Sequence, residues 1–296
     1  MSATTTPSAL PDMAAQLQLT VEATLDHYVT NLGSPNGSLR ETSLDQLSDW
    51  IAAQELSTDQ LQGLIPVLIE GCQQGLGSLT GPAVFQRSFS VLALALVIEH
   101  DNDHDSLADG DLDAVVVSAL RLIKDELDFS GYQGTEQGWA HCLAHLGDLC
   151  YSLYSSPNLT VGHSEALLQA LADKLRHLGD GQFYYDEDER LANALLAGVK
   201  AEHIDLAQFG AFLDRLCRPP TWQQLYFSPG DDEGFPWIGA YETPASAKRY
   251  RDIKNFLKTL YCQLVLRQDL HTEGAYIDLL SARIRAIDNG FYALGN

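Results

Sequence analysis

The sequence predicts an all-α fold, an α/α superhelix in which helix pairs of the HEAT or armadillo kind stack into a solenoid. Apolar residues recur at helical spacing in nearly every segment, which is typical of amphipathic helices. No segment alternates apolar and polar residues between turns, as a sheet protein would. The predicted helices also form pairs that recur about every 50 residues, slightly more than the repeat length of known helical solenoids.

The expected helices follow in order along the chain. The first apolar stripe combines Leu44, Leu47, Ile51 and Leu56. The second covers residues 61–69, and Ser57 and Gln60 have the spacing of a capping box at its start. Further helices are expected at about 83–99, 112–127, 138–154, 164–178, 187–200, 205–216, 246–267 and 273–288. The same helices could also close into an α/α toroid, which is the alternative to an open solenoid.

The domain organisation is expected to be simple. Residues 1–12 are rich in Ser, Thr and Pro and are predicted to be disordered, and residues 13–296 to form a single helical domain. Two connections are predicted to be long. The acidic one, 99–113, lacks the Gly and Glu of a calcium loop and is interpreted as solvated charge. The aromatic and proline-rich one, 218–245, is either a lid or a structural cap.

Composition limits the possible partners and the compartment. The chain has 296 residues with 18 Lys and Arg against 40 Asp and Glu, a formal net charge of −22. Such a chain repels nucleic acids and anionic membranes and favours a basic protein or peptide, or a small polar cationic ligand. The five cysteines are scattered, and no signal peptide or membrane-length apolar run is found. We therefore expect a cytoplasmic protein, and no motif predicts a cofactor.

The densest group of reactive side chains lies at 138–148. On a helix, His141, His145 and Asp148 share one face, opposite an apolar stripe that begins at Trp139. Their simplest interpretation is a polar face turned to solvent or to a hydrogen-bonding neighbour. These three residues could instead hold Zn²⁺ or contact a ligand, although Cys142 occupies the position of the general base in an HExxH metalloprotease motif.

Two other positions carry charge at predicted helix starts. The carboxylates of residues 186–189 complement the dipole of the helix that follows them. Arg87 precedes the uniformly apolar run Val91–Ile98, so its helix is expected to be buried. A buried arginine requires a carboxylate or carbonyl partner.

Four runs carry a family resemblance: RSFS at 87–90, GWAHxxAHxxDL at 138–149, EDERLA at 187–192 and NFLKTLY at 255–261. In this order they resemble a bacterial family, found mainly among Firmicutes, that is catalogued only as a domain of unknown function. The resemblance covers roughly residues 60–265 and implies a helical chain without an established activity. It directs attention to Arg87, His141, His145, Asp148, Asp188, Glu189 and Asn255.

All four runs fall on alternate predicted helices, which would be neighbours in a solenoid. We therefore expect a binding or scaffold module that presents a polar, acidic concave groove formed by these seven residues. A metal-dependent hydrolase is the alternative, with His141, His145 and Asp148 as metal ligands and Glu187 or Asp188 as general base. A purely structural module is the third possibility, and the sequence does not decide whether the protein is an enzyme.

Overall fold

The structure, a computed structural model, describes residues 24–178, 183–217, 244–267, 270 and 273–287. Its helices are α2 (Gly37–Ala52), α3 (Thr58–Gln73), α4 (Ala83–His104), α5 (Asp111–Asp125), α6 (Cys142–Tyr154), α7 (Val161–Arg176), α8 (Glu187–Lys200), α9 (Leu206–Cys217), α11 (Pro244–Leu266) and α12 (Glu273–Ile287). Residues 24–31 are also helical. The described residues contain no strand, only an isolated bridge between Tyr132 and Trp139. The predicted all-α class is confirmed.

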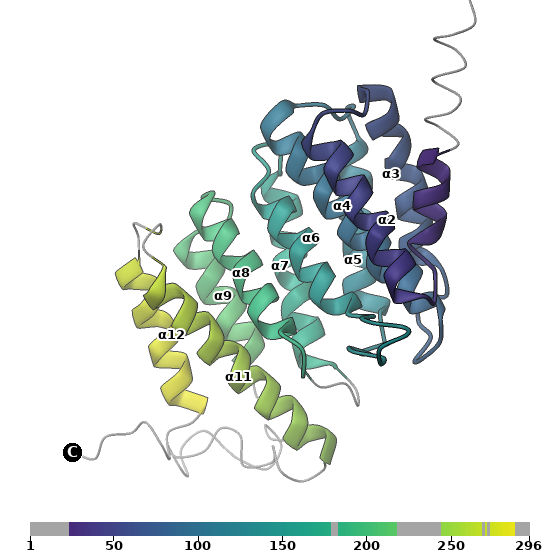
Figure 1. The fold of residues 1–296 in the computed structure, drawn as a ribbon. Coiled ribbons are helices and arrows are strands. Elements are labelled where there is room, and N and C mark those ends of the chain that lie inside the picture. The colour runs from purple at the N-terminus through teal and green to yellow at the C-terminus, as the bar shows by residue number, and fades with distance from the viewer. Residues whose placement is uncertain (1–23, 179–182, 218–243, 268–269, 271–272, 288–296) are drawn as a thin grey trace, which may run out of the picture.

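The helices lie in two rows. One row contains α2, α4, α6, α8 and α11, and the other contains α3, α5, α7, α9 and α12, with contacts running from neighbour to neighbour along each row. The first and last of these helices lie at opposite ends of the array (Figure 1). The described helices therefore form an open α/α superhelix, as predicted, and not a closed toroid.

The contacts among α4, α6 and α8 are the most extensive in the molecule. Small side chains allow this close approach, among them Ser88 on α4 and Ala144 on α6, both buried. A Cβ atom added at Gly147 of α6 would lie only 2.9 Å from Cβ of Arg190 on α8. Because α4 and α8 cover α6 on both sides, all residues of α6 except Asp148 and Tyr151 are buried.

One hydrophobic cluster runs through the whole array, from Leu25 before α2 to Ile287 at the end of α12. The predicted capping box at the start of α3 is confirmed. The backbone N–H of Gln60 donates to Oγ of Ser57 at 3.3 Å, and the backbone N–H of Ser57 donates to Oε1 of Gln60 at 2.9 Å. These two bonds satisfy donors that the first helical turn leaves without an intrahelical partner.

Two predicted boundaries are wrong. The long acidic connection 99–113 is mostly helical, because α4 continues to His104 and only residues 105–110 connect it to α5. Asp101 is buried near the end of α4 and accepts hydrogen bonds from the backbone N–H groups of Ser106 and Leu107 at 2.7 and 2.8 Å. The helix predicted at 138–154 begins only at Cys142. The predicted disordered segment 1–12, and 218–243 of the aromatic connection, lie outside the described residues.

α4 is the one helix of the described chain that is long and apolar enough to cross a membrane by length and composition. Two thirds of its apolar window is buried inside the array, between α2 and α6, as in the core helix of a soluble protein. The apolar character of α4 is therefore explained by its central position.

Candidate functional site

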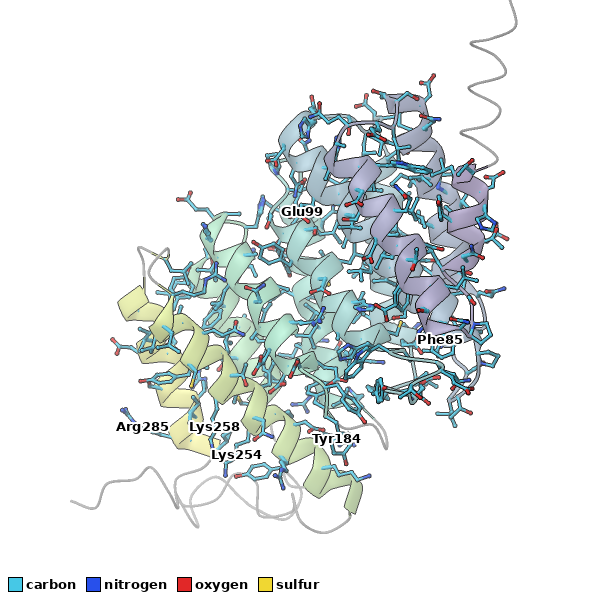
Figure 2. The ribbon with its side chains drawn as sticks, viewed as in Figure 1. Phe85, Glu99, Tyr184, Lys254, Lys258 and Arg285 are labelled. Atoms are coloured by element: carbon cyan, nitrogen blue, oxygen red, sulfur yellow. The ribbon has the colours of Figure 1, made fainter. Side chains whose placement is uncertain are left out.

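The amino-terminal ends of α4, α6 and α8 lie on the same side of the array. Figure 2 shows Phe85 of α4 and Tyr184, just before α8, toward this side, and Glu99 of α4 toward the opposite side. The connection that leads into α6 and the one that leads into α8 meet here, because the rings of Trp139 and Tyr185 are in contact with centroids 5.5 Å apart. This side of the array, where α4, α6 and α8 begin, carries the candidate site.

Five rings form what we call the aromatic cluster: Tyr132, Trp139, His141, Tyr184 and Tyr185. The indole of Trp139 stacks on the imidazole of His141 with centroids 4.8 Å apart and also contacts Tyr132 at 5.2 Å. Tyr132, Trp139 and Tyr184 are 45%, 38% and 68% exposed. Large aromatic side chains grouped in this way on a surface are typical of binding sites.

His141 connects the two loops of the site. It lies before the first turn of α6 with a φ of 60°, and its Nε2 contacts the backbone oxygen of Tyr185. The predicted helical face of His141, His145 and Asp148 is therefore wrong for His141, and the three side chains meet hydrogen-bonding neighbours, which was one of the two predicted surroundings. His141 is outside the helix, and both imidazoles are buried because α4 and α8 cover α6.

His145 belongs to a buried hydrogen-bonded chain. Its Nδ1 lies 2.8 Å from Oγ and 3.3 Å from the carbonyl oxygen of Ser88. A carbonyl only accepts, so Nδ1 carries the proton, and the Ser88 hydroxyl then donates to the carbonyl of Ala140. Burial, together with the nearby His141 and Arg190, lowers the pKa of His145 to about 3, so the imidazole is neutral.

This neutral imidazole makes stability depend on pH. In the unfolded chain His145 takes up a proton below about pH 6.5, whereas in the folded protein it stays neutral down to about pH 3. The unfolded state therefore binds more protons in this window, and the free energy of unfolding falls with decreasing pH by up to about 1.4 kcal/mol per pH unit. We expect urea unfolding between about pH 7 and 4 to show this contribution as the difference between wild type and His145→Gln.

The comparison between variants is necessary because burial raises the pKa of Asp252 to about 7, which gives a slope of opposite sign above about pH 4. His177→Gln, which removes an exposed histidine, serves as the matched control. Parallel pH profiles for wild type and His145→Gln would contradict the assignment of a neutral, buried His145.

Arg40 of α2 supports the loop that carries the aromatic cluster. Its buried guanidinium donates to the carbonyls of Ser34, Gln137 and Trp139 at 2.6, 2.5 and 2.9 Å. It also lies over the rings of Phe85 and Phe89, with its Cζ atom 4.2 and 4.6 Å from their centroids. Two of the three carbonyls belong to the loop, so Arg40 fixes the backbone on both sides of Gly138.

The other predicted residues are placed separately. Asp148 pairs with Arg190, and Asp188 accepts a hydrogen bond from the Thr259 hydroxyl at 3.0 Å. Glu189 and Asn255 are exposed. The predicted groove is therefore only partly assembled: His145 contacts His141 of the aromatic cluster, whereas Asp188 faces α11.

Arg87 lies outside this surface, in a buried network. Its Nε and Nη2 donate to the two carboxylate oxygens of Glu126 at 2.6 and 2.9 Å, which confirms the predicted need for a partner. Glu126 also accepts from the Cys142 thiol at 3.3 Å and from the backbone N–H of Asp128 at 2.8 Å. This network joins α4, the residue that follows α5, and α6 in the interior of the array.

The metal site predicted from His141, His145 and Asp148 finds no support in the geometry. Each candidate ligand has another partner: the Tyr185 carbonyl, Ser88 and Arg190 respectively. Within the described part of the chain, no group of three or more His, Cys, Asp or Glu side chains could hold a metal ion. The arrangement therefore does not favour the metal-dependent hydrolase.

Sequence reasoning missed several residues of this region. Arg40 occupies an apolar-stripe position, because Arg40, Ser43, Leu47 and Ile51 are all buried on α2. Extending the stripe of Leu47 and Ile51 toward the amino terminus would have found it. No comparable signal marked Tyr185 or Glu126, which lie in connections between helices and meet their partners only through the fold.

Residues 73–232 match the family described as "Protein of unknown function (DUF2785)". This segment takes in α4 to α9 and therefore the whole aromatic cluster. The resemblance to a family of unknown function is confirmed over residues 73–232, whereas the run at 255–261 lies outside the matched segment. No curated protein matches the chain.

Proposed function

The chain belongs to the DUF2785 family of proteins of unknown function, and from this premise we propose that it is a binding module. Its aromatic cluster receives a positively charged Lys or Arg side chain of a protein or peptide partner. The observation that carries the proposal is the exposure of Tyr132, Trp139 and Tyr184 on two connections whose rings meet through Tyr185. Aromatic rings grouped in this way attract cations through their faces.

The supporting contacts hold the rings in place before any partner arrives. Trp139 stacks on His141, whose own ring is buried and contacts the Tyr185 carbonyl. The guanidinium of Arg40 donates a hydrogen bond to the carbonyl oxygen of Trp139. A binding surface that is already ordered loses little conformational entropy on association, which favours affinity.

The charge around the cluster also favours a cation. Glu187, which begins α8, is buried and accepts hydrogen bonds from the backbone N–H groups of Tyr184 and Tyr185 at 3.0 and 2.8 Å. Asp188 and Glu187 both raise the pKa of the buried Asp252 on α11, after the larger effect of burial. With a net charge of −22 over the whole chain, the field steers basic partners toward the protein.

We place this function in the cytoplasm. All five cysteines are free, and Cys72, Cys142 and Cys150 are buried without a disulfide. Unpaired thiols in this number suit a reducing compartment.

The test is binding of an octa-arginine peptide to wild type and Trp139→Ala, measured by calorimetry. Losing the central indole of the cluster is expected to weaken binding about tenfold or more, the effect of about 1.4 kcal/mol or more that truncated aromatic anchors show. Trp50→Ala is the matched control, because Trp50 is a half-buried indole that packs against Tyr28. Gln54, four residues after Trp50, contacts His104 at the carboxy-terminal end of α4. The cluster lies near the amino-terminal end of α4, so Trp50 is remote from it.

Octa-arginine also binds any acidic protein through charge alone. The effect of removing the Trp139 indole therefore decides whether the aromatic cluster is the binding site. Equal weakening by Trp139→Ala and Trp50→Ala would refute the proposed site. Retained binding by Trp139→Ala would assign the affinity to the overall negative field instead.

A further inference from the structure

The carboxy-terminal helix pair has a charge opposite to that of the rest of the chain. Residues 244–287 contain eight of the 18 Lys and Arg residues but only four of the 40 Asp and Glu residues. Figure 2 shows Lys254 and Lys258 of α11 and Arg285 of α12 gathered on one side of this pair. A local excess of cations in so acidic a chain indicates a different kind of ligand at this end of the array.

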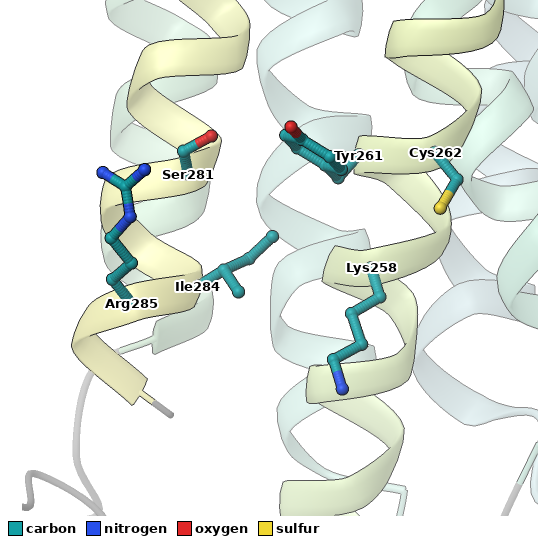
Figure 3. A pocket seen from close by; sticks show the side chains of 6 residues that line it. All are labelled: Lys258, Tyr261, Cys262, Ser281, Ile284 and Arg285. Carbon is teal, nitrogen blue, oxygen red and sulfur yellow. The ribbon is translucent and has the colours of Figure 1, made fainter. Parts of the chain in front are cut away.

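A cavity of about 360 Å³ lies between α11 and α12, which we call the α11–α12 pocket. It is lined by Lys258, Tyr261, Cys262, Ser281, Ile284 and Arg285. Tyr261 and Ile284 point toward one another across the space between the helices (Figure 3). Arg285 lies beside Ser281 on the α12 side and Lys258 on the α11 side, so an apolar centre has a cation on either side (Figure 3).

We infer that the α11–α12 pocket binds a small organic acid, with its apolar body between Tyr261 and Ile284 and its anionic head at Arg285, beside Ser281. The volume is in the range of small-molecule sites. None of the described residues that line the pocket is acidic, so a metal ion or an amine would find no carboxylate there. The Ser281 hydroxyl adds a neutral donor beside Arg285.

An inorganic anion alone does not explain the lining. The ring of Tyr261 and the side chain of Ile284 offer apolar contact that phosphate cannot use. An aromatic or medium-chain aliphatic carboxylate uses both the apolar centre and the cation of Arg285. This site is separate from the aromatic cluster, and it takes a ligand of opposite charge.

Cys262 provides a reporter inside the pocket. It is the exposed cysteine of the five, whereas Cys72, Cys142 and Cys150 are buried and Cys217 is half-buried. Burial raises the pKa of Cys217 to about 12, which keeps its thiol protonated and slow to react. Alkylation by N-ethylmaleimide, followed by peptide mass spectrometry, therefore reports on Cys262, with Cys217 as internal reference.

The experiment measures the alkylation rate of Cys262 with and without 2-naphthoate. At roughly ten times its dissociation constant, naphthoate is expected to slow Cys262 about tenfold and to leave Cys217 unchanged. Arg285→Gln is expected to weaken naphthoate binding about tenfold, because a charged hydrogen-bond donor is lost, so the protection at the same concentration falls to about twofold. Lys254→Gln, a cation on α11 that does not line the pocket, is expected to change it less than about threefold.

Three results would overturn the inference. The first is an unchanged rate for Cys262 at saturating naphthoate. The second is equal protection by naphthalenemethanol, which has the same apolar body without a charge, or by inorganic phosphate, which has the charge alone. The third is equal loss of protection in Lys254→Gln and Arg285→Gln, which would assign the effect to general charge.

Discussion

Replacing Glu126 by glutamine is expected to lower the free energy of unfolding by about 3–5 kcal/mol, because it leaves the charge of Arg87 buried without its hydrogen-bonded counterion. Both side chains of this pair are only 1% exposed, and the guanidinium binds both carboxylate oxygens. Glutamine keeps the shape and one acceptor for the backbone N–H of Asp128, so the loss measures the charge and not a cavity.

The chain offers a matched control in a second bidentate pair. Arg215 binds Asp173 through Nε and Nη2 at 2.7 and 2.5 Å, with side chains that are 43% and 47% exposed. Asp173→Asn is expected to cost less than about 1 kcal/mol, because water solvates both charges. Urea unfolding of both variants measures the two losses in the free energy of unfolding. Similar losses in Glu126→Gln and Asp173→Asn would show that Arg87 is solvated in the folded protein.

Replacing Arg40 by methionine is expected to cost about 3 kcal/mol of stability and to impair the aromatic cluster. Methionine fills much of the space between Phe85 and Phe89, so packing changes little. The carbonyls of Gln137 and Trp139 lose their donor, however, and the loop on either side of Gly138 is no longer held to α2. Two readouts are needed: urea unfolding and calorimetric binding of octa-arginine.

Arg121→Met is the control for Arg40→Met, because Arg121 is an exposed arginine and its loss is expected to change stability by less than about 0.5 kcal/mol. Arg40→Lys is expected to fall between wild type and Arg40→Met, since an ammonium group keeps the charge but cannot reach three carbonyls in the geometry of the guanidinium. If Arg40→Met is less stable but binds the peptide with full affinity, then Arg40 stabilises the fold and does not support the proposed site.

The sequence predicted the helices well, because their apolar periodicity is local information. The starts at 83 and 187 and the capping box of Ser57 and Gln60 agree with the structure. Prediction failed where the backbone leaves ideal geometry. A helical wheel assumes that His141 and His145 share one helix, whereas His141 has a positive φ and α6 begins after it.

The site was less predictable than the fold, because its contacts join distant parts of the chain. Ser88 and His145 are 57 positions apart, and Arg40 and Trp139 are 99 positions apart. The burial of α6 could not be inferred from its own sequence, since it depends on α4 and α8 lying on both sides. A wheel assigns one solvent face to every amphipathic helix, whereas α6, in the middle of its row, has almost none.

The neighbour-to-neighbour packing of the rows has an evolutionary consequence. A helix pair at either end of such an array can be added, lost or replaced without rebuilding the interfaces at the centre. The segment that matches the family begins at the last residue of α3 and ends before α11, so it leaves out almost all of the first described pair and the whole of the last. The match therefore covers the middle three described pairs, and the packing allows a terminal pair to change without disturbing them. The proposed organic-acid pocket lies in such a terminal pair, outside the matched segment, whereas the aromatic cluster lies inside it.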